Sequence, residues 1–253
     1  MPAAYDTYDY PAYWHGRRYE HESEILAIKH FLQKIKRIES ILEIGAGYGR
    51  LTPSYIFRGK KITLTDPSAK LLMTARRRYK SKKVKFIQSR LENLPKKVRA
   101  SSCDMVIMVR VLHHIEDINN TFRVVYRILK DRGYFILEFP NKRHFKATFS
   151  EFTKGNFTFP IDIFPRDIRC ATNLKKNTLP FINYHPDHIV RILESNNFEI
   201  IEKLSASNLR SPLFKKIMPM EFLLFLDQFF YKIFSILNFG PSIFILARKK
   251  PTI

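Results

Sequence analysis

Two hydrophobic patterns alternate along most of the chain. Short, nearly continuous apolar runs are typical of buried strands, whereas apolar residues three or four positions apart are typical of amphipathic helices. The runs predict strands at 40–44, 61–66, 84–88, 103–109, 134–139, 198–204 and 241–249. The helical spacing predicts helices at 20–38, 50–58, 68–80, 119–130 and 186–197.

This alternation predicts an α/β fold. Apolar strands separated by helices indicate a parallel sheet that is covered on both faces. We therefore expect residues 1–253 to form one domain with a Rossmann-like, seven-stranded, mostly parallel sheet. An aromatic and acidic arm, residues 1–24, precedes the first strand.

A segment at 141–185 interrupts the alternation. It is rich in aromatic, proline, asparagine and basic residues, and it follows the carboxyl end of the fifth predicted strand. Ligands of open α/β sheets bind at that edge, so the segment is either a lid over the substrate or a surface loop with its own aromatic cluster.

A helical insertion at 208–240 precedes the last strand. Its stretch 219–240 holds too many charged and polar residues for a membrane-spanning helix. On a helical wheel one face is apolar, and it consists of Phe222, Phe225, Leu226, Phe229, Phe230, Ile233, Phe234 and Leu237. Such a helix could pack on the domain, cover the active site, pair with another subunit or lie on a membrane.

The net charge and the cysteine content bear on the possible partners of the protein and on its cellular compartment. The formal net charge of +21 favours nucleic acid, an anionic membrane surface or an acidic small molecule as partners, or else reflects a solvated basic surface. Cys103 and Cys170 have no metal-ligand spacing, so we expect no metal site and a reducing compartment. No signal-peptide pattern opens the chain, which predicts a cytoplasmic protein, with membrane association as an alternative.

A glycine-rich turn follows the first predicted strand. Gly45, Gly47 and Gly49 read GxGxG, with Glu43 just ahead in the strand. Dinucleotide sites favour GxGxxG instead, so the spacing indicates a cofactor without a phosphate. Asp66 ends the second strand, where a carboxylate can accept both hydroxyls of a ribose.

Four segments in this order resemble the cofactor motifs of the class I S-adenosylmethionine-dependent methyltransferases. They are ILEIGAGYGRL, LTDPS, FIQSRLENLP and CDMVIMVRVLHHIED. The closest likeness is to the small-molecule branch that includes ubiquinone and menaquinone C-methyltransferases, and it covers residues 38–140.

The resemblance implies a set of ligands for S-adenosylmethionine. The implied residues are Glu43 at the amino group, Gly45, Ala46 and Gly47 along the methionine, Asp66 at the ribose, Pro67 and Ser68 at the adenine, the Leu91 backbone, and Arg110 near the methionine end. In relatives an arm closes over the cofactor, which makes Tyr13, Trp14 and Arg18 candidates. Arg90 stands where the family usually has an aspartate that binds the adenine amine, and an arginine cannot accept that bond.

Two histidines are the candidates for chemistry. Methyl transfer needs alignment of the reactants and, for some acceptors, a base. His113 and His114 lie where the substrate pocket of the family begins, and either could be that base, a substrate contact or a packing residue.

The sequence therefore predicts methyl transfer from S-adenosylmethionine to a small or lipophilic acceptor. The alternatives are an RNA methyltransferase, an NAD-dependent or nucleotide-sugar reductase that uses the same turn, and a noncatalytic cofactor-binding adaptor for a membrane or a protein partner.

Overall fold

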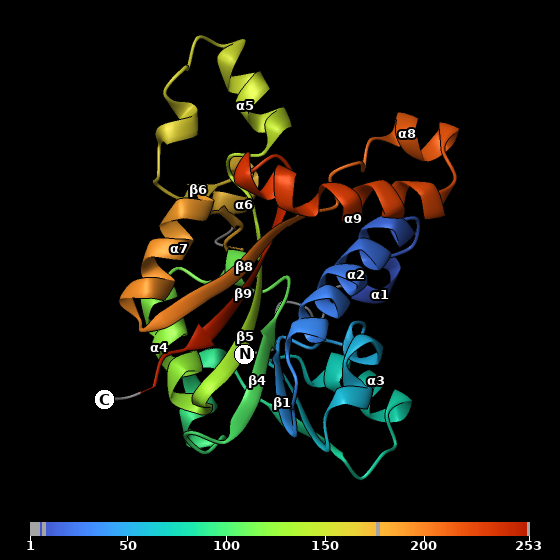
Figure 1. Cartoon of the computed structure of the whole chain (residues 1–253), viewed down its shortest axis with the longest axis vertical. Helices are drawn as coiled ribbons and strands as arrows, with labels where there is room; N and C mark the ends of the chain where they lie inside the picture. The colour runs from blue at the N-terminus through green and yellow to red at the C-terminus, as the bar shows by residue number, and fades with distance from the viewer. Residues whose placement is uncertain (1–5, 7–8, 176–177, 252–253) are drawn as a thin grey trace.

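The computed structural model describes residue 6, residues 9–175 and residues 178–251. Its centre is a seven-stranded sheet in the order β3-β2-β1-β4-β5-β9-β8 (Figure 1). The strands are β1 (Ser40–Ile44), β2 (Lys61–Asp66), β3 (Val84–Gln88), β4 (Cys103–Met108), β5 (Leu129–Pro140), β8 (Phe198–Ala206) and β9 (Ser242–Lys249). Only β9 runs antiparallel to its neighbours β5 and β8, so the predicted mostly parallel sheet is confirmed.

Helices cover both faces of this sheet (Figure 1). They are α1 (Tyr10–Tyr13), α2 (Arg18–Lys34), α3 (Ala69–Arg78), α4 (Ile118–Ile128), α5 (Phe145–Phe152), α6 (Ala171–Lys175), α7 (Pro186–Ser195), α8 (Pro212–Ile217) and α9 (Met220–Ile236). Along β4, Met105 and Ile107 belong to one core, and Val106 and Met108 belong to the other. This alternation follows from the two-residue period of a strand, and it explains why the strands read as continuous apolar runs.

The helix predicted at 50–58 is wrong. The chain forms two single turns of 3-10 helix there, at Thr52–Ser54 and Ile56–Arg58. The Ser54 hydroxyl donates to the Leu51 carbonyl at 2.6 Å, a local bond that competes with the α-helical pattern. The Arg58 guanidinium donates to carbonyls at the end of α2, which ties this segment to a neighbour rather than to its own next turn.

The segment 141–185 contains α5, a 3-10 turn at Phe159–Ile161, α6 and the two-stranded pair β6 (Arg166–Asp167) and β7 (Ile182–Asn183). Asn141 anchors its start, because its side-chain amide donates to the carbonyls of Asn238 and Gly240. Buried Lys142 then donates to Asp162 within the segment at 2.6 Å. The segment is therefore attached to the sheet at its base, while α5 extends away from the sheet (Figure 1).

Helix α9 packs on α2 and β8 with the face opposite to its aromatic, apolar one. The inward residues are Leu223, Asp227, Tyr231 and Ser235, one per helical turn. The apolar face named from the helical wheel is instead exposed or half-buried. The sequence identified the two faces of the helix. Of the alternatives that it left open, packing of the aromatic face on the domain does not occur in the described structure, since that face is exposed or half-buried.

Asp227 is the physical reason for this orientation. Its carboxylate accepts hydrogen bonds from the Ser23 hydroxyl at 2.6 Å, from the backbone N–H groups of Ser207 and Asn208 at 3.0 and 2.9 Å, and from the Asn208 amide at 2.6 Å. A buried carboxylate is tolerated only with such donors, and they all lie beneath α9.

We predict that Asp227→Ala destabilises the fold by about 3 kcal/mol, because it removes the buried acceptor shared by the Ser23 hydroxyl, the Ser207 and Asn208 N–H groups and the Asn208 amide. Urea unfolding followed by far-ultraviolet circular dichroism measures this change. Gln228→Ala, an exposed position on the same helix, is the control and should change stability by less than about 0.5 kcal/mol. Equal effects of the two substitutions would contradict the anchoring role of Asp227.

Candidate cofactor-binding cleft

A cleft opens at the carboxyl ends of β1 to β4. Among the residues that line it are Gly45, Gly47, Asp66, Leu91, Arg110 and His114. They come from four separate segments, each of which follows a strand of the parallel sheet. This edge is where open α/β sheets bind their ligands.

The glycine turn forms one wall of the cleft. Gly45 and Gly47 have φ values of +71° and +55°, in the left-handed region that favours glycine. A side chain at Gly45 would collide with Val111, which also lines the cleft. A Cβ on Gly47 would lie 3.8 Å from Leu71 and 3.9 Å from Tyr10. Because both of these residues line the cleft, such a side chain would occupy ligand space.

Asp66 is held at the end of β2 by backbone donors. The N–H groups of Gly47 and Ser68 each donate to its carboxylate at 2.8 Å. Burial raises the pKa of Asp66 to about 6, although these two bonds favour the ionised form. Each carboxylate oxygen can accept more than one bond, so the group can also receive ligand hydroxyls from the cleft.

The end of β3 supplies a carboxylate that sequence reasoning missed. Arg90 and Leu91 line the cleft, and so does Glu92, two positions after the place where the family usually has its aspartate. The 3-10 turn Leu91–Lys96 begins at this point and brings Glu92 round to the cleft. The sequence signal that could have predicted this carboxylate is Glu92 itself, the acidic residue in RLENLP.

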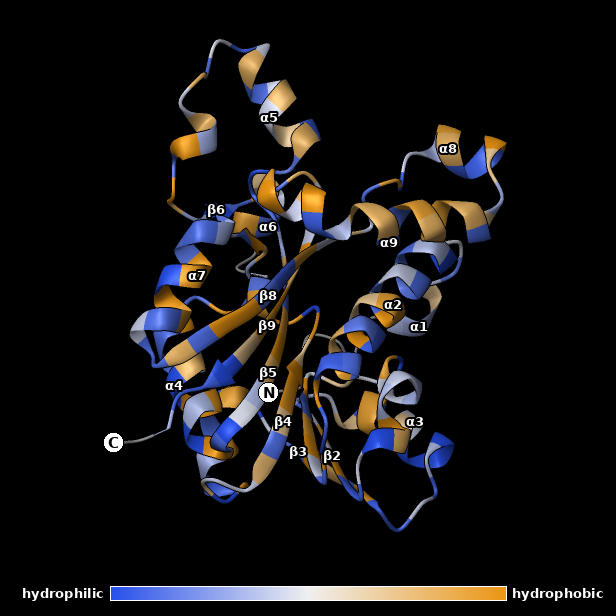
Figure 2. Ribbon diagram, viewed as in Figure 1, coloured by the Kyte–Doolittle hydropathy of each residue, from blue (hydrophilic) through white to orange (hydrophobic). Residues whose placement is uncertain are grey.

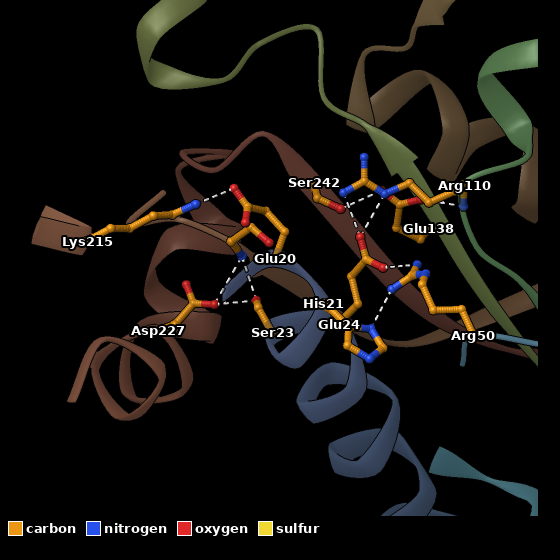
Figure 3. Close-up of polar contacts among 11 residues, drawn as sticks. Glu20, His21, Ser23, Glu24, Arg50, Arg110, Glu138, Lys215, Asp227 and Ser242 are labelled. Carbon is orange, nitrogen blue, oxygen red and sulfur yellow. Dashed lines mark hydrogen bonds and ion pairs between the residues drawn. The ribbon is translucent and has the colours of Figure 1, made fainter. Parts of the chain in front are cut away.

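Arg110 connects the cleft to a buried ionic network (Figure 3). Its φ of +61° turns the chain after β4, and its backbone N–H donates to Glu138 on β5 at 2.8 Å. Its side chain donates to Glu24 of α2 through Nε at 2.7 Å. Ser242 on β9 donates to the other oxygen of Glu138, so four elements meet at Arg110.

Glu24 is fully buried between two arginines (Figure 3). Arg110 contacts one carboxylate oxygen at 2.6 Å, and Arg50, which follows the glycine turn, contacts the other at 2.5 Å. Burial alone would raise the pKa of Glu24, but the two guanidinium groups hold it below its ordinary value. The Arg50 guanidinium also lies over the Trp14 ring, 3.4 Å from its centroid.

The N-terminal arm reaches the cleft through a residue that was not predicted. Tyr10 of α1 lines the cleft, whereas Trp14 is buried against Arg50. Arg18 is exposed at the first position of α2 and does not line the cleft. The chain turns at Gly16, where φ is +75°, before α2 begins. Arg50 and Arg110 both lie over Trp14 at this place, and the predicted contact of Arg18 with a ligand stays a prediction.

Three other predicted ligands lie behind the cleft lining. The Glu43 carboxyl accepts bonds from the hydroxyls of Thr52 and Tyr55, and burial raises its pKa to about 7. Ala46 is buried, and its N–H donates to the Thr65 carbonyl at 2.9 Å. Ser68 caps α3 by accepting from the Leu71 N–H. Their structural contacts support the turn; their predicted contact with a ligand stays a prediction. The predicted ligands that line the cleft are Gly45, Gly47, Asp66, Pro67, Leu91 and Arg110.

The two histidines differ in position. His114 lines the cleft, and its Nδ1 lies 2.7 Å from the Pro180 carbonyl. A carbonyl only accepts, so Nδ1 carries the proton and Nε2 is the basic nitrogen. His113 is buried beside it and packs on Phe181. Burial lowers the pKa of both histidines, so both are neutral at pH 7.

We predict that Glu24→Ala lowers stability by about 4 kcal/mol, because it leaves two arginines without their buried carboxylate. Glu24→Gln keeps an oxygen acceptor and should cost less. Urea unfolding measures both, with Glu39→Ala as the control at an exposed ion pair with Arg37. If Glu24→Ala lowers the free energy of unfolding no more than Glu39→Ala does, the ionic network does not stabilise the fold.

Comparisons with known proteins agree with this geometry. Residues 42–137 match the model of a methyltransferase domain. The demethylmenaquinone methyltransferase of Chlamydia felis (strain Fe/C-56) is 29% identical over 119 residues, which are 45% of this chain and 51% of that protein. Probable polyketide synthase 42 of Dictyostelium discoideum is 32% identical over 192 residues, 66% of this chain but 7% of that protein. The match thus spans about half of the first relative and a small part of the second.

A solved structure shows the same fold. The S-adenosylmethionine-dependent methyltransferase from Mesorhizobium loti has a TM-score of 0.60 and 16% identity, and the alignment covers 90% of this chain and 98% of that one. Its fold, the matched domain and the arrangement of the cleft agree with the motifs read from the sequence. Residues 42–137 are therefore similar to a methyltransferase domain, and the chain has the fold of the Mesorhizobium loti S-adenosylmethionine-dependent methyltransferase.

Proposed function

We propose that this protein transfers a methyl group from S-adenosylmethionine to a small, lipophilic acceptor. The observation that carries the proposal is that Gly47, Asp66 and His114 line one cleft although they follow three different strands. The name of the Chlamydia felis relative contains a quinone acceptor, demethylmenaquinone, which supports the lipophilic class.

The residues of the cleft fit the parts of this cofactor. Asp66 can accept the ribose hydroxyls, and Glu92 can accept from the adenine amine, which Arg90 cannot. Leu71 and Leu91 provide apolar surface for the base. Arg110 supplies a positive charge for the carboxylate of the methionine part. When bound, the cofactor supplies an electrophilic methyl group on a positively charged sulfur.

The acceptor side of the cleft combines apolar walls with a neutral base. Val111, Ile115 and Leu179 line it, and Leu179 comes from the segment 141–185. The end of this segment also fixes His114 through the Pro180 carbonyl, as expected for a lid. Nε2 of His114 is thereby prepared to take a proton from an acceptor, because its pKa is lowered and its tautomer is set.

Binding of S-adenosylhomocysteine, measured by isothermal titration calorimetry, tests the cofactor assignment. Ionised Asp66 accepts the ribose hydroxyls, but its protonated form cannot accept them as well. Because its pKa is about 6 without ligand, affinity should be full above pH 6 and fall as the pH decreases through that value. Asp66→Asn should weaken binding at pH 8 at least about 10-fold and remove this part of the pH dependence.

Glu92→Gln should weaken the binding of S-adenosylhomocysteine less than Asp66→Asn does, since Glu92 is exposed. A circular dichroism spectrum confirms that each variant is folded. Unchanged affinity in Asp66→Asn would refute the ribose contact, and failure of the unmodified protein to bind would refute the cofactor.

Release of S-adenosylhomocysteine in the presence of quinone precursors, glycolipids or RNA tests the acceptor and the base. We expect turnover with quinone precursors and a loss of about 100-fold in His114→Ala, with cofactor affinity unchanged. The rate should depend on a group with a pKa below 6.5, so it should be level above that pH and fall below it. His188→Ala on α7 is the control. If only RNA supports turnover, the acceptor is RNA and the proposal of a small, lipophilic acceptor is wrong.

A further inference from the structure

Helix α9 has its apolar face on the outside. The exposed side chains Phe222, Phe225, Phe229, Ile233 and Ile236 follow one another three or four positions apart, and exposed Leu237 comes directly after them. They therefore form one continuous stripe, which we call the outer face of α9. Monomeric soluble proteins rarely expose an apolar surface of this length without a partner for it.

The orientation of α9 is built into the fold. Asp227 and Tyr231 lie on the opposite face, where both are bound to Ser23 of α2. Rotation of the helix to bury its outer face would withdraw Asp227 from its four hydrogen bonds. The outer face thus stays exposed because Asp227 and Tyr231 on the inner face have their hydrogen-bond partners beneath the helix.

The apolar surface continues beyond α9. Phe234 lies 4.6 Å from Phe239, and Phe239 lies 5.0 Å from Phe145 of α5, measured between ring centroids. Phe149, the next turn of α5, is also exposed, and so are Leu213 and Ile217 of α8. In Figure 2, α5, α8 and α9 carry hydrophobic stretches and lie at one end of the molecule. This is the end to which the carboxyl ends of the parallel strands point, and those strand ends hold the cleft (Figure 1).

Basic residues lie among the same apolar side chains. Lys216 is exposed on α8 between Phe214 and Ile217, and Lys146 is exposed on α5 between Phe145 and Phe149. Lys232 is exposed next to Ile233 on α9. Lysines interspersed with exposed aromatic and aliphatic groups are suited to the interface of an anionic bilayer, where the apolar groups insert and the cations meet lipid headgroups.

We propose that the outer face of α9, together with α5 and α8, docks on the surface of an anionic phospholipid bilayer. The net charge of +21 favours this occupant over a second copy of the chain. A two-fold contact through this surface would place like-charged lysines of two strongly basic molecules together. No helix in the described part of the chain is long and apolar enough to cross a membrane.

Vesicle flotation of the full chain tests this proposal. The protein is mixed with vesicles of phosphatidylcholine alone or of phosphatidylcholine containing phosphatidylglycerol, and the floating fraction is measured. We expect flotation with phosphatidylglycerol, a much smaller fraction without it, and a decrease as salt is added.

Two matched variants locate the contact. Phe229 on the outer face is 66% exposed, and Phe57, which follows the first strand and lies outside the proposed surface, is 64% exposed. Phe229→Glu should lower vesicle affinity about 10-fold or more, because it removes an inserting ring and adds a negative charge. Phe57→Glu makes the same chemical change and should leave the affinity within about 2-fold.

The other outcomes overturn the proposal. It fails if the unmodified protein does not float with phosphatidylglycerol vesicles, or if both variants lose affinity equally while remaining folded. It also fails if sedimentation shows a dimer that Phe229→Glu dissociates and flotation is absent, since a second copy would then cover the face. Binding of S-adenosylhomocysteine is measured on the same samples, so a failure of docking and a failure of the cofactor assignment are distinguished.

Discussion

The buried carboxylate of Glu24 is the interaction on which the arrangement of the cleft depends. It joins α2 to Arg50 after β1 and to Arg110 after β4, and Arg110 is joined to Glu138 of β5 through its backbone. A carboxylate without water needs such partners, and the arginines likewise need the carboxylate. The mutual requirement fixes where the N-terminal arm, the glycine turn and the β4 loop meet.

This network also explains why a nonglycine residue turns the chain after β4. Arg110 adopts a positive φ, which is unfavourable for a residue with a side chain. Its backbone bond to Glu138 and its side-chain bonds to Glu24 hold it in that conformation. Strain at the edge of a ligand cleft is thus balanced by ionic contacts beneath it.

A second buried acid, Asp227, controls the outer surface of the molecule in the same way. Its hydrogen bonds to α2 and to the loop after β8 require the polar face of α9 to point inward. The aromatic face is consequently exposed. Helix α9 itself lies at the end of the molecule to which the carboxyl ends of the parallel strands point (Figure 1). The structure therefore has a cleft at the carboxyl ends of the parallel strands and an exposed apolar surface at the same end of the molecule.

The sequence by itself determined the sheet, its order of elements and most of the cleft, because these depend on local signals. Strand periodicity, the positive-φ glycines and an acid at the end of β2 act within a few residues of chain. Only the tertiary structure decided where Arg18, Glu43 and Glu92 lie relative to the cleft and which way α9 faces. The aromatic pattern of α9 identified two faces, but the donors that Asp227 binds come from residues 23 and 207–208, about 200 and 20 positions away. Contacts between such distant positions satisfy buried charges, and no local pattern encodes which charge will be buried.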